Sequence, residues 1–414
     1  MSTAFIIAEY HPFHNGHAHM AAQLHAAGYD TVAAVMSGNF VQRGTPALLP
    51  QQVRAAAALA CGVDIVLQLP CRAAAASAGR FAAAGAAAAV AAGADVLAFG
   101  AETPDTAALR TVTAALRNER FPALLREALD TGVPFHTARA AAAETLCPGA
   151  AALLATPNNI LAVEYIAALE AMSAAGCRVP AVLPLPRLGA AHDGAPAQGI
   201  ASASWLRGQP LPVWREYVPQ AAFSLYENAF AAGQVLDPAR WELLAQALLR
   251  SRSREQLAAA PDAAEGLDAL LYSAIRENTS LEDICAAVKS KRYTLSRVRR
   301  LVLAASLGWS APETGATALT AAKSSAEACL AADLPYLRVL GANTAGKRML
   351  SDMAQAAPIP VSPSLAALER LGGAAAQTAR REAAAADLYA LCLQRPQPCG
   401  QEYRLPFLTD TAVR

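Results

Sequence analysis

Two histidines stand in a segment that could bind a nucleotide and cleave its phosphates. The apolar run Phe5–Ala8 predicts a buried strand, Pro12 ends it, and apolar residues resume at helical spacing after Gly16. His14 and His17 therefore fall at a helix start, where free backbone N–H groups and the helix dipole favour phosphate. Imidazole N–H groups add donors that can follow charge onto a leaving pyrophosphate. A helix cap with solvated histidines is the alternative, which the order of strand, proline, glycine and helix disfavours.

A pair of serines precedes a second helix-like run. Ser202 and Ser204 stand two residues apart, and Arg207 follows within the first turn. Small hydroxyls and backbone N–H groups at a helix start can bind phosphate, and the guanidinium adds a cation. The same pattern is typical of an ordinary helix N-cap, so both interpretations stay open.

The segment 37–44 follows the second predicted strand and places glycines on both sides of Gln42 and Arg43. Such a loop can close over a ligand and bring a guanidinium against phosphate or carboxylate. A surface turn with a solvated arginine is the alternative. The same choice between a ligand contact and a local role applies to Arg187, Asn158 and Asn159. We expect a substrate loop formed by Ser37, Gly38, Asn39, Gln42 and Arg43.

The elements that must position these residues alternate between strand and helix. Strand-like runs occur at residues 5–8, 31–36, 64–69, 95–99 and 178–185, and helix-like runs separate them. This alternation predicts an α/β fold with a doubly wound, parallel, Rossmann-like sheet that binds ligands at the carboxyl ends of its strands. Near residue 210 prolines mark a boundary, beyond which helix-like runs dominate. We therefore expect a catalytic domain over residues 1–210 and a mainly α-helical domain over residues 211–414 with a proline-rich tail.

Composition narrows the class of protein. Of 414 residues, 54% are hydrophobic and 16% are charged, as in a globular protein with large cores. A formal net charge of +1 gives no global signal for nucleic acid or membrane, so a polyanion site must come from local clustering. The eight cysteines lack metal-site spacing, and we expect reduced thiols in a cytoplasmic protein. No run predicts a leader or a membrane span.

Six cations fall within twelve residues, from Lys289 to Arg300, on this nearly neutral chain. Apolar residues of the preceding run mark a core face, so the cations form a basic helix face with an aromatic residue beside it. This face could bind an RNA backbone and stack on an unpaired base. A solvated amphipathic helix and a mobile ATP-binding loop at 289–291 are the alternatives. The candidate RNA contacts are Lys289, Lys291, Arg292, Tyr293, Arg297, Arg299 and Arg300.

The pattern His-x-Gly-His at 14–17 resembles the signature of the HIGH-type nucleotidyltransferase superfamily. Members join an acid or a phosphate to the α-phosphate of a nucleotide and expel pyrophosphate. Residues 200–207 resemble the second superfamily motif, Ile-Ser-Ser-Thr-x-Ile-Arg, with alanines at 201 and 203 and a spacing one residue longer. The resemblance implies that His14 and His17 are catalytic and stabilise charge on the α,β-bridging oxygen, helped by Mg²⁺.

Segments along nearly the whole chain resemble the bacterial tRNA(Met) cytidine acetate ligase family. They lie at residues 8–17, 37–44, 99–102, 157–161, 289–294 and 338–343. The resemblance implies that acetate and ATP form acetyl-adenylate, whose acetyl group passes to N4 of the wobble cytidine of elongator tRNA(Met), giving N4-acetylcytidine. It implies ATP contacts at Ile7, Ala8, Glu9, Tyr10, His11, Pro12, Phe13, Asn15, Gly16, Met20, Gly100, Asn158, Asn159, Arg187 and Leu188, beside Ser202, Ser204 and Arg207.

Two departures from the family stand within these segments. His11 occupies a position where the family has asparagine, which leaves the role of this position open. Residues 187–193 read Arg-Leu-Gly-Ala-Ala-His-Asp, where the family more often shows Gly-Tyr before His-Asp. The second departure allows different contacts to adenine.

Two other functions compete with an ATP-dependent RNA-modifying ligase. A small-molecule adenylyltransferase of the same superfamily is disfavoured by the long helical half with its cation cluster. A nucleotide-binding regulatory module without catalysis is disfavoured by the intact histidine pair and the paired serines. We expect ATP, acetate and elongator tRNA(Met) as substrates, and neither a membrane nor a protein partner.

Overall fold

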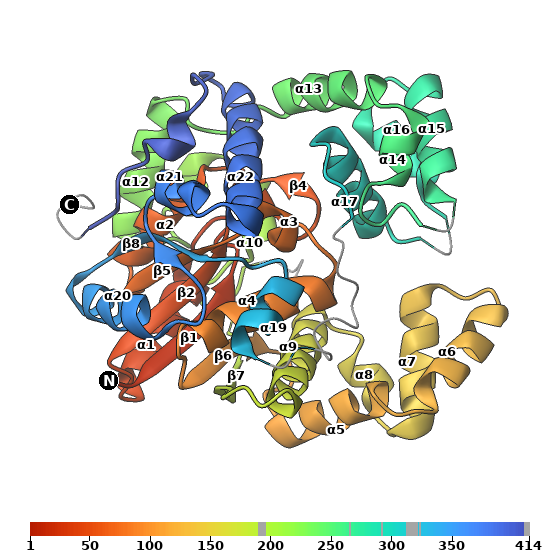
Figure 1. Ribbon diagram of the computed structural model, residues 1–414, viewed down its shortest axis with the longest axis horizontal. Coiled ribbons are helices and arrows are strands. Elements are labelled where there is room, and N and C mark those ends of the chain that lie inside the picture. Colours follow the sequence, from red (N-terminus) through yellow and green to blue (C-terminus); the bar gives the residue numbers. More distant parts are fainter. Residues whose placement is uncertain (189–195, 265, 291–292, 312–321, 323, 410–414) are drawn as a thin grey trace.

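The structure is a computed structural model that describes residues 1–188, 196–264, 266–290, 293–311, 322 and 324–409. At its centre lies a seven-stranded sheet with the order β7-β6-β1-β2-β5-β8-β9 (Figure 1). Five parallel strands carry the candidate site, namely β1 (Thr3–Ala8), β2 (Thr31–Ser37), β5 (Ile65–Leu69), β6 (Val96–Ala101) and β7 (Ala181–Pro186). Each overlaps one of the five predicted strands, and the predicted α/β fold is confirmed.

The sheet also takes two strands from the last quarter of the chain. β8 (Leu337–Ala342) pairs antiparallel with β5, and β9 (Val361–Ser362) pairs parallel with β8. The sheet is therefore mixed at this edge, and the chain beyond residue 210 is not wholly helical. Arg338 and Gly341 interrupt the apolar run of β8, which weakens its strand pattern. The division into two domains at residue 210 stays a prediction.

Alternate residues of the strands supply two cores, as a sheet covered on both faces requires. Ala33 and Val35 belong to the core formed with α4 (Ala78–Ala91), α9 (Pro157–Ala174), α19 (Ser325–Ala331) and α20 (Thr344–Ala356). Ala34 and Met36 belong to the core formed with α2 (Gln51–Ala60), α10 (Ala203–Arg207), α11 (Leu211–Trp214) and α12 (Gln220–Ala231). On this second face α1 (Asn15–Ala26) packs against β1, β2 and β6.

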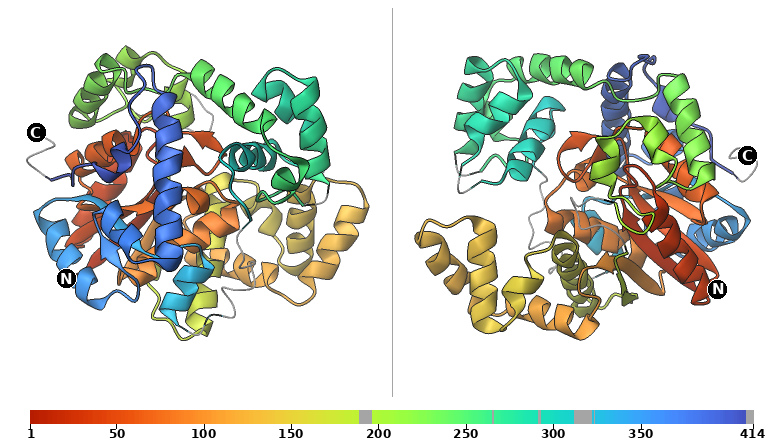
Figure 2. Two further views of the ribbon diagram at one scale, coloured as in Figure 1. Left: turned by 45° about the horizontal axis from the view of Figure 1, so that its top comes forward. Right: turned by 180° about the vertical axis from the view of Figure 1, so that it is seen from behind.

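Two groups of helices project from the same side of this body (Figures 1 and 2). The first contains α5 (Thr106–Leu116), α6 (Phe121–Asp130), α7 (Phe135–Leu146) and α8 (Ala150–Leu153). The second, here called the helical module, contains α13 (Pro238–Arg250), α14 (Arg254–Ala258), α15 (Leu267–Glu277), α16 (Leu281–Val288) and α17 (Leu295–Ser306). The module has its own core, in which Leu249, Leu271, Ile284 and Val298 are buried. The predicted cation segment spans the end of α16 and the start of α17.

The last elements fold back onto the sheet body. They are α21 (Leu365–Arg370), α22 (Gly373–Leu391) and the 3-10 turn η1 (Gln401–Tyr403). α22 packs near α3 (Cys71–Ala74) and the hairpin of β3 (Phe40–Val41) and β4 (Thr45–Pro46), where the Tyr389 hydroxyl donates to the carbonyl of Ala47 at 2.8 Å. Among the described helices, none has the length and apolar character needed to cross a membrane.

Candidate active site

A cavity of about 460 Å³ opens at the carboxyl ends of β1, β6 and β7. This is where a doubly wound sheet binds its ligands. The loop after β1, the β3–β4 hairpin and the starts of α9 and α10 contribute to its walls. The predicted site residues that line it are Ile7, Ala8, Glu9, Tyr10, His11, His14, Gly16, His17, Met20, Gln42, Arg43, Gly100, Asn158, Arg187, Leu188, Ser202, Ser204 and Arg207.

The two motif histidines lie side by side at the start of α1. His14 is the N-cap, and its Nδ1 accepts a hydrogen bond from the backbone N–H of Gly16 at 3.1 Å. Nδ1 of His17 accepts from the backbone N–H of His14 at 3.2 Å, and the two rings stack with centroids 3.8 Å apart. The backbone hydrogen bonds at the helix start therefore use Nδ1 of each ring, which leaves Nε2 for a ligand.

Both motif histidines are neutral at neutral pH. Burial, together with the charge of Arg187, lowers the pKa of His14 to about 3. Burial also lowers the pKa of His17 well below its ordinary value, with smaller contributions from His14 and Arg187. Because Nδ1 accepts a backbone hydrogen bond in each ring, Nε2 carries the proton. Each ring thus presents one N–H donor that a ligand can use.

Two arginines hold the loop between β1 and α1, Arg207 from the cavity wall and Arg54 from the buried side. Arg207 donates to the backbone carbonyl of His11 at 2.6 Å. Arg54 of α2 is fully buried and joins the ends of β1 and β2, because its guanidinium donates to the carbonyl oxygens of Glu9, Ser37, Gly38 and Leu49. Sequence reasoning missed Arg54, which stands within an ordinary alanine-rich helix.

Three predicted ATP contacts of this loop, Pro12, Phe13 and Asn15, are not among the residues that line the cavity. The backbone N–H of Phe13 donates to the hydroxyl of Tyr226 at 3.0 Å. The Asn15 side chain donates to the backbone carbonyl of Gly199 at 2.9 Å. These contacts fasten the loop to α12 and to the segment that precedes α10.

The paired serines combine both interpretations of their motif. Ser202 is the N-cap of α10 and accepts from the backbone N–H of Trp205 at 3.2 Å. The hydroxyl oxygens of Ser202 and Ser204 lie 3.2 Å apart, and both residues line the cavity. A cap and a phosphate contact are therefore compatible here.

The β3–β4 hairpin brings the tip of the predicted substrate loop to the cavity wall. The backbone N–H of Gln42 donates to Oε1 of Glu9 at 2.7 Å, and both Gln42 and Arg43 line the cavity. Gly44 has φ +77°, and a Cβ there would lie 2.5 Å from the backbone nitrogen of Arg300 in α17. Glycine at this position thus lets the hairpin touch the helical module.

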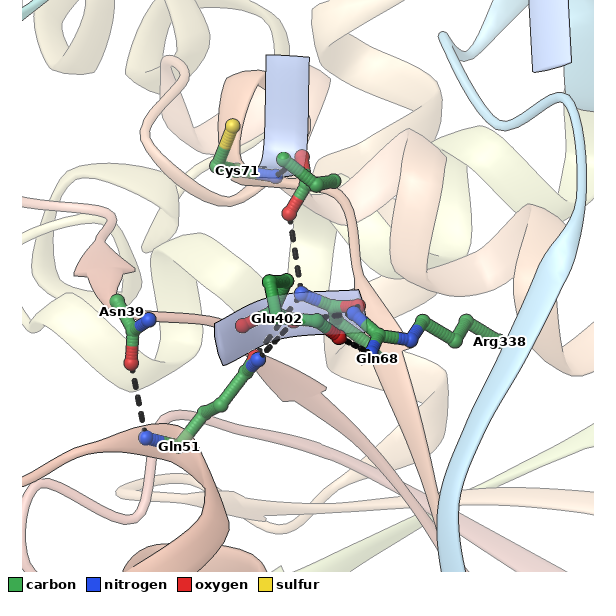
Figure 3. Close-up of polar contacts among 7 residues, drawn as sticks. Asn39, Gln51, Gln68, Cys71, Arg338 and Glu402 are labelled. Carbon is green, nitrogen blue, oxygen red and sulfur yellow. Dashed lines mark hydrogen bonds and ion pairs between the residues drawn. The ribbon is translucent and has the colours of Figure 1, made fainter. Parts of the chain in front are cut away.

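The base of the same loop rests on a buried polar network (Figure 3). Oδ1 of Asn39 accepts from the backbone N–H of Gln51 at 2.9 Å, and the Gln51 side chain donates to Glu402 at 2.5 Å. Arg338 forms an ion pair with Glu402 and donates to Gln68 at 3.0 Å. Ser37, Gly38 and Asn39 therefore support the loop, and the cavity lining does not include them.

A second buried carboxylate completes this network. Glu382 accepts from the backbone N–H of Cys71 at 2.7 Å and from the Gln68 side chain at 3.0 Å. Burial raises the pKa of Glu382 to about 7. The C-terminal elements thus reach the end of β5 with charged groups, a contribution that the sequence did not reveal.

At the end of β6 a glycine permits close packing. A Cβ at Gly100 would lie 3.3 Å from Cγ of Arg187 and 3.5 Å from Cε of Met20. Arg187 also lies 3.7 Å from the carboxylate of Glu102. This wall is therefore formed by two side chains that were both predicted as ATP contacts.

The two predicted asparagines have different environments. Asn158 lines the cavity, and its side chain donates to Glu102 at 2.5 Å. Asn159 is buried, and its Oδ1 accepts from the backbone N–H of Thr103 at 3.0 Å. Asn158 is thus the better placed of the two for a ligand.

Five of the seven predicted tRNA contacts are described, and they lie from the end of α16 to the first half of α17. Lys289 and Arg299 are exposed. Tyr293 is buried in the core of the module, with Arg297 over its ring 5.0 Å from the centroid, so its predicted role as a stacking surface for RNA is wrong. Arg300 forms an ion pair with Asp262 at 3.1 Å, so its charge is partly balanced. Lys291 and Arg292 lie outside the described residues.

Comparison with known proteins gives a consistent result. The model of the HIGH Nucleotidyl Transferase family matches residues 1–403. The tRNA(Met) cytidine acetate ligase of Syntrophotalea carbinolica is 34% identical over 88% of this chain and 85% of its own, and that of Acetivibrio thermocellus is 28% identical over 97% and 98%. Crystal structures of Thermotoga maritima TmcAL, apo and bound with alpha-thio ATP, superpose with TM-scores of 0.85 and 0.84. They are 25% identical and cover 99% of this chain and 100% of theirs. The chain belongs to the tRNA(Met) cytidine acetate ligase family.

Membership of this family confirms the predicted superfamily, fold and class of enzyme, a ligase. The individual site residues stay predictions. The cavity also has an apolar wall that includes Phe81, Phe99, Ile160, Leu161 and Tyr165, of which the sequence analysis missed Phe81 and Tyr165. Phe81 and Tyr165 come from core helices, where an aromatic residue at helical spacing looks like any other core residue.

Proposed function

We propose that this chain activates acetate with ATP and transfers the acetyl group to N4 of the wobble cytidine of elongator tRNA(Met). The observation that carries the proposal is the stacked pair His14 and His17, each neutral and each with one N–H left for a ligand. The names of the related ligases and the ATP analogue bound to Thermotoga maritima TmcAL support it.

In the first step the acetate oxygen attacks the α-phosphate of ATP, and pyrophosphate leaves. This reaction needs in-line positioning and charge stabilisation rather than a protein nucleophile. The Nε2–H groups of His14 and His17 would donate to the oxygen that bridges the α- and β-phosphates. Ser202, Ser204 and Arg207 would bind the phosphates, and Arg187 the nucleotide.

Magnesium would accompany the nucleotide. The described residues contain no cluster of three or more His, Cys, Asp or Glu side chains that could hold a metal ion. Phosphate oxygens and water would therefore supply most ligands of Mg²⁺, as is usual for this ion. When bound, Mg²⁺ would neutralise charge on the phosphates.

The tRNA would approach from the helical module. The contact between Gly44 and the backbone of Arg300 joins α17 to the hairpin that reaches the cavity. Exposed Lys289 and Arg299 would bind the RNA backbone, and Lys291 and Arg292 belong to the same proposal. A target cytidine must leave its stack to react.

Pyrophosphate release from ATP, measured with and without acetate and in the absence of tRNA, tests the first step. The proposal predicts release that depends on acetate and falls with longer acids such as butyrate. Release that depends instead on a phosphorylated small molecule would favour a small-molecule adenylyltransferase and contradict the proposal.

A further inference from the structure

The second step requires a group that removes a proton from the attacking amine. The N4 amine of cytosine is a weak nucleophile, because its lone pair is delocalised into the ring. A base that takes the proton as the new bond forms avoids a cationic product, and such general-base catalysis contributes about 10²–10⁴-fold. The base must line the cavity and have an unoccupied lone pair.

The three histidines of the motif loop cannot serve as this base. Nδ1 of His14 and Nδ1 of His17 each accept a backbone hydrogen bond, and their other nitrogens carry the proton. Nε2 of His11 accepts from the backbone N–H of Leu48 at 2.7 Å, so its Nδ1 carries the proton. In all three rings the remaining nitrogen is therefore a donor.

The other polar side chains of the cavity are donors or weak bases. Arg43, Arg187 and Arg207 are cations, and Ser202, Ser204 and Gln42 have no basic group. Burial raises the pKa of Tyr165 well above its ordinary value, and the charge of Glu9 raises it further, so the phenol stays protonated. His19 is exposed and is the fourth histidine among the described residues that line the cavity.

Glu9 meets both requirements for the base, a place on the cavity wall and an unoccupied lone pair. Among the described residues that line the cavity it is the only carboxylate. Its Oε1 accepts from the backbone N–H of Gln42 at 2.7 Å, which fixes the carboxylate at the cavity wall. Its backbone carbonyl is held by the buried Arg54 at 2.6 Å. In the described part of the chain no donor contacts Oε2, which leaves this oxygen able to accept a proton.

We infer that Glu9 is the proton acceptor of the acetyl transfer step, an inference that rests on the proposed function. N4 attacks the carbonyl carbon of acetyl-adenylate, and the new C–N bond forms. The C–O bond to the phosphate breaks, and AMP leaves with the electron pair. The proton of N4 passes to Oε2 of Glu9 and from there to water.

The substitution Glu9→Gln separates this role from a structural one, because glutamine keeps an oxygen for the N–H of Gln42. We expect transfer of labelled acetate to tRNA to fall by about 10²–10⁴-fold, while acetate-dependent pyrophosphate release falls far less. Hydroxylamine, a strong nucleophile that needs no protein base, should still yield acetohydroxamate from ATP and acetate.

His19→Gln is the matched control, and its transfer rate should stay within a few-fold of the wild-type rate. A greater loss in His19→Gln than in Glu9→Gln would assign the proton to His19 and overturn the inference. Equal losses of pyrophosphate release and transfer in Glu9→Gln would place Glu9 in activation instead and also overturn it. Failure of the proposed function itself would be distinguishable, since the wild-type protein would then release no acetate-dependent pyrophosphate.

Discussion

The cavity and the cation segment of the helical module hold their polar groups in different ways. In the cavity, His14 and His17 are oriented by backbone N–H groups, and the loop beneath them is fastened by buried Arg54. In the module, Lys289 and Arg299 are exposed to solvent. The first region is built around fixed donors, whereas in the second Lys289 and Arg299 present charge at the surface.

This difference separates two tasks. Fixed donors in a water-poor site stabilise charge that develops in a transition state, because they need no reorganisation. Exposed cations attract an RNA backbone and act on affinity, which falls as salt rises. Substitutions in or under the cavity should therefore change rate or folding, whereas substitutions in the cation segment should change tRNA affinity alone.

The largest effect is expected at the buried network under the substrate loop. Arg338→Met leaves the carboxylate of Glu402 buried without its cation, which should lower the free energy of unfolding by about 3–5 kcal/mol. Chemical denaturation monitored by circular dichroism measures it. Arg380→Met is the matched control, because Arg380 pairs with Glu369 at an exposed site and should cost at most about 1 kcal/mol. Equal costs for the two variants would contradict the assignment of the network as a buried support.

At the histidine pair the effect should fall on catalysis. His17→Ala removes one fixed donor and should lower the rate of acetate-dependent pyrophosphate release by about 10²–10³-fold. Binding of tRNA, measured by filter binding, should persist. A loss below about tenfold would contradict the role of His17 in charge stabilisation.

The raised pKa of Glu382 predicts a pH-dependent contribution to stability. The folded protein binds a proton at Glu382 up to a pKa of about 7, above that of an unfolded glutamate, so this group lowers stability as pH rises toward 7. The substitution Glu382→Gln removes this loss of stability, because glutamine does not titrate. The free energy of unfolding of the variant relative to wild type should increase by up to about 3 kcal/mol between about pH 5 and about pH 8. A difference that does not vary with pH would show that Glu382 titrates normally.

The smallest effect per residue is expected at the cation segment. Lys289→Glu combined with Arg299→Glu should weaken tRNA binding about tenfold and lower the slope of affinity against salt by about two. Pyrophosphate release without tRNA should not change. Arg276→Glu, an exposed position elsewhere in the module, is the control. Unchanged tRNA affinity would assign the cation segment to structure.

Local patterns in the sequence predicted the fold and the motif residues, whereas long-range contacts were hidden. The five parallel strands and the helix starts at His14 and Ser202 follow from apolar periodicity, prolines and caps. Arg54 and Glu382 stand in ordinary alanine-rich helices, and the family-like segment that contains Arg338 does not show that this side chain is buried. The partners of all three come from other segments of the chain. β8 was not predicted for the same reason, because its pairing with β5 joins strands that lie far apart in the sequence.

Transfer of labelled acetate to tRNA measures the proposed reaction itself. The wild-type protein is incubated with ATP, acetate and either the elongator tRNA(Met) transcript or the same transcript with uridine at the wobble position. The account predicts that label enters only the cytidine transcript, as N4-acetylcytidine, with one pyrophosphate and one AMP formed per acetyl group. Equal labelling of both transcripts, or pyrophosphate release without any labelled RNA, would contradict it.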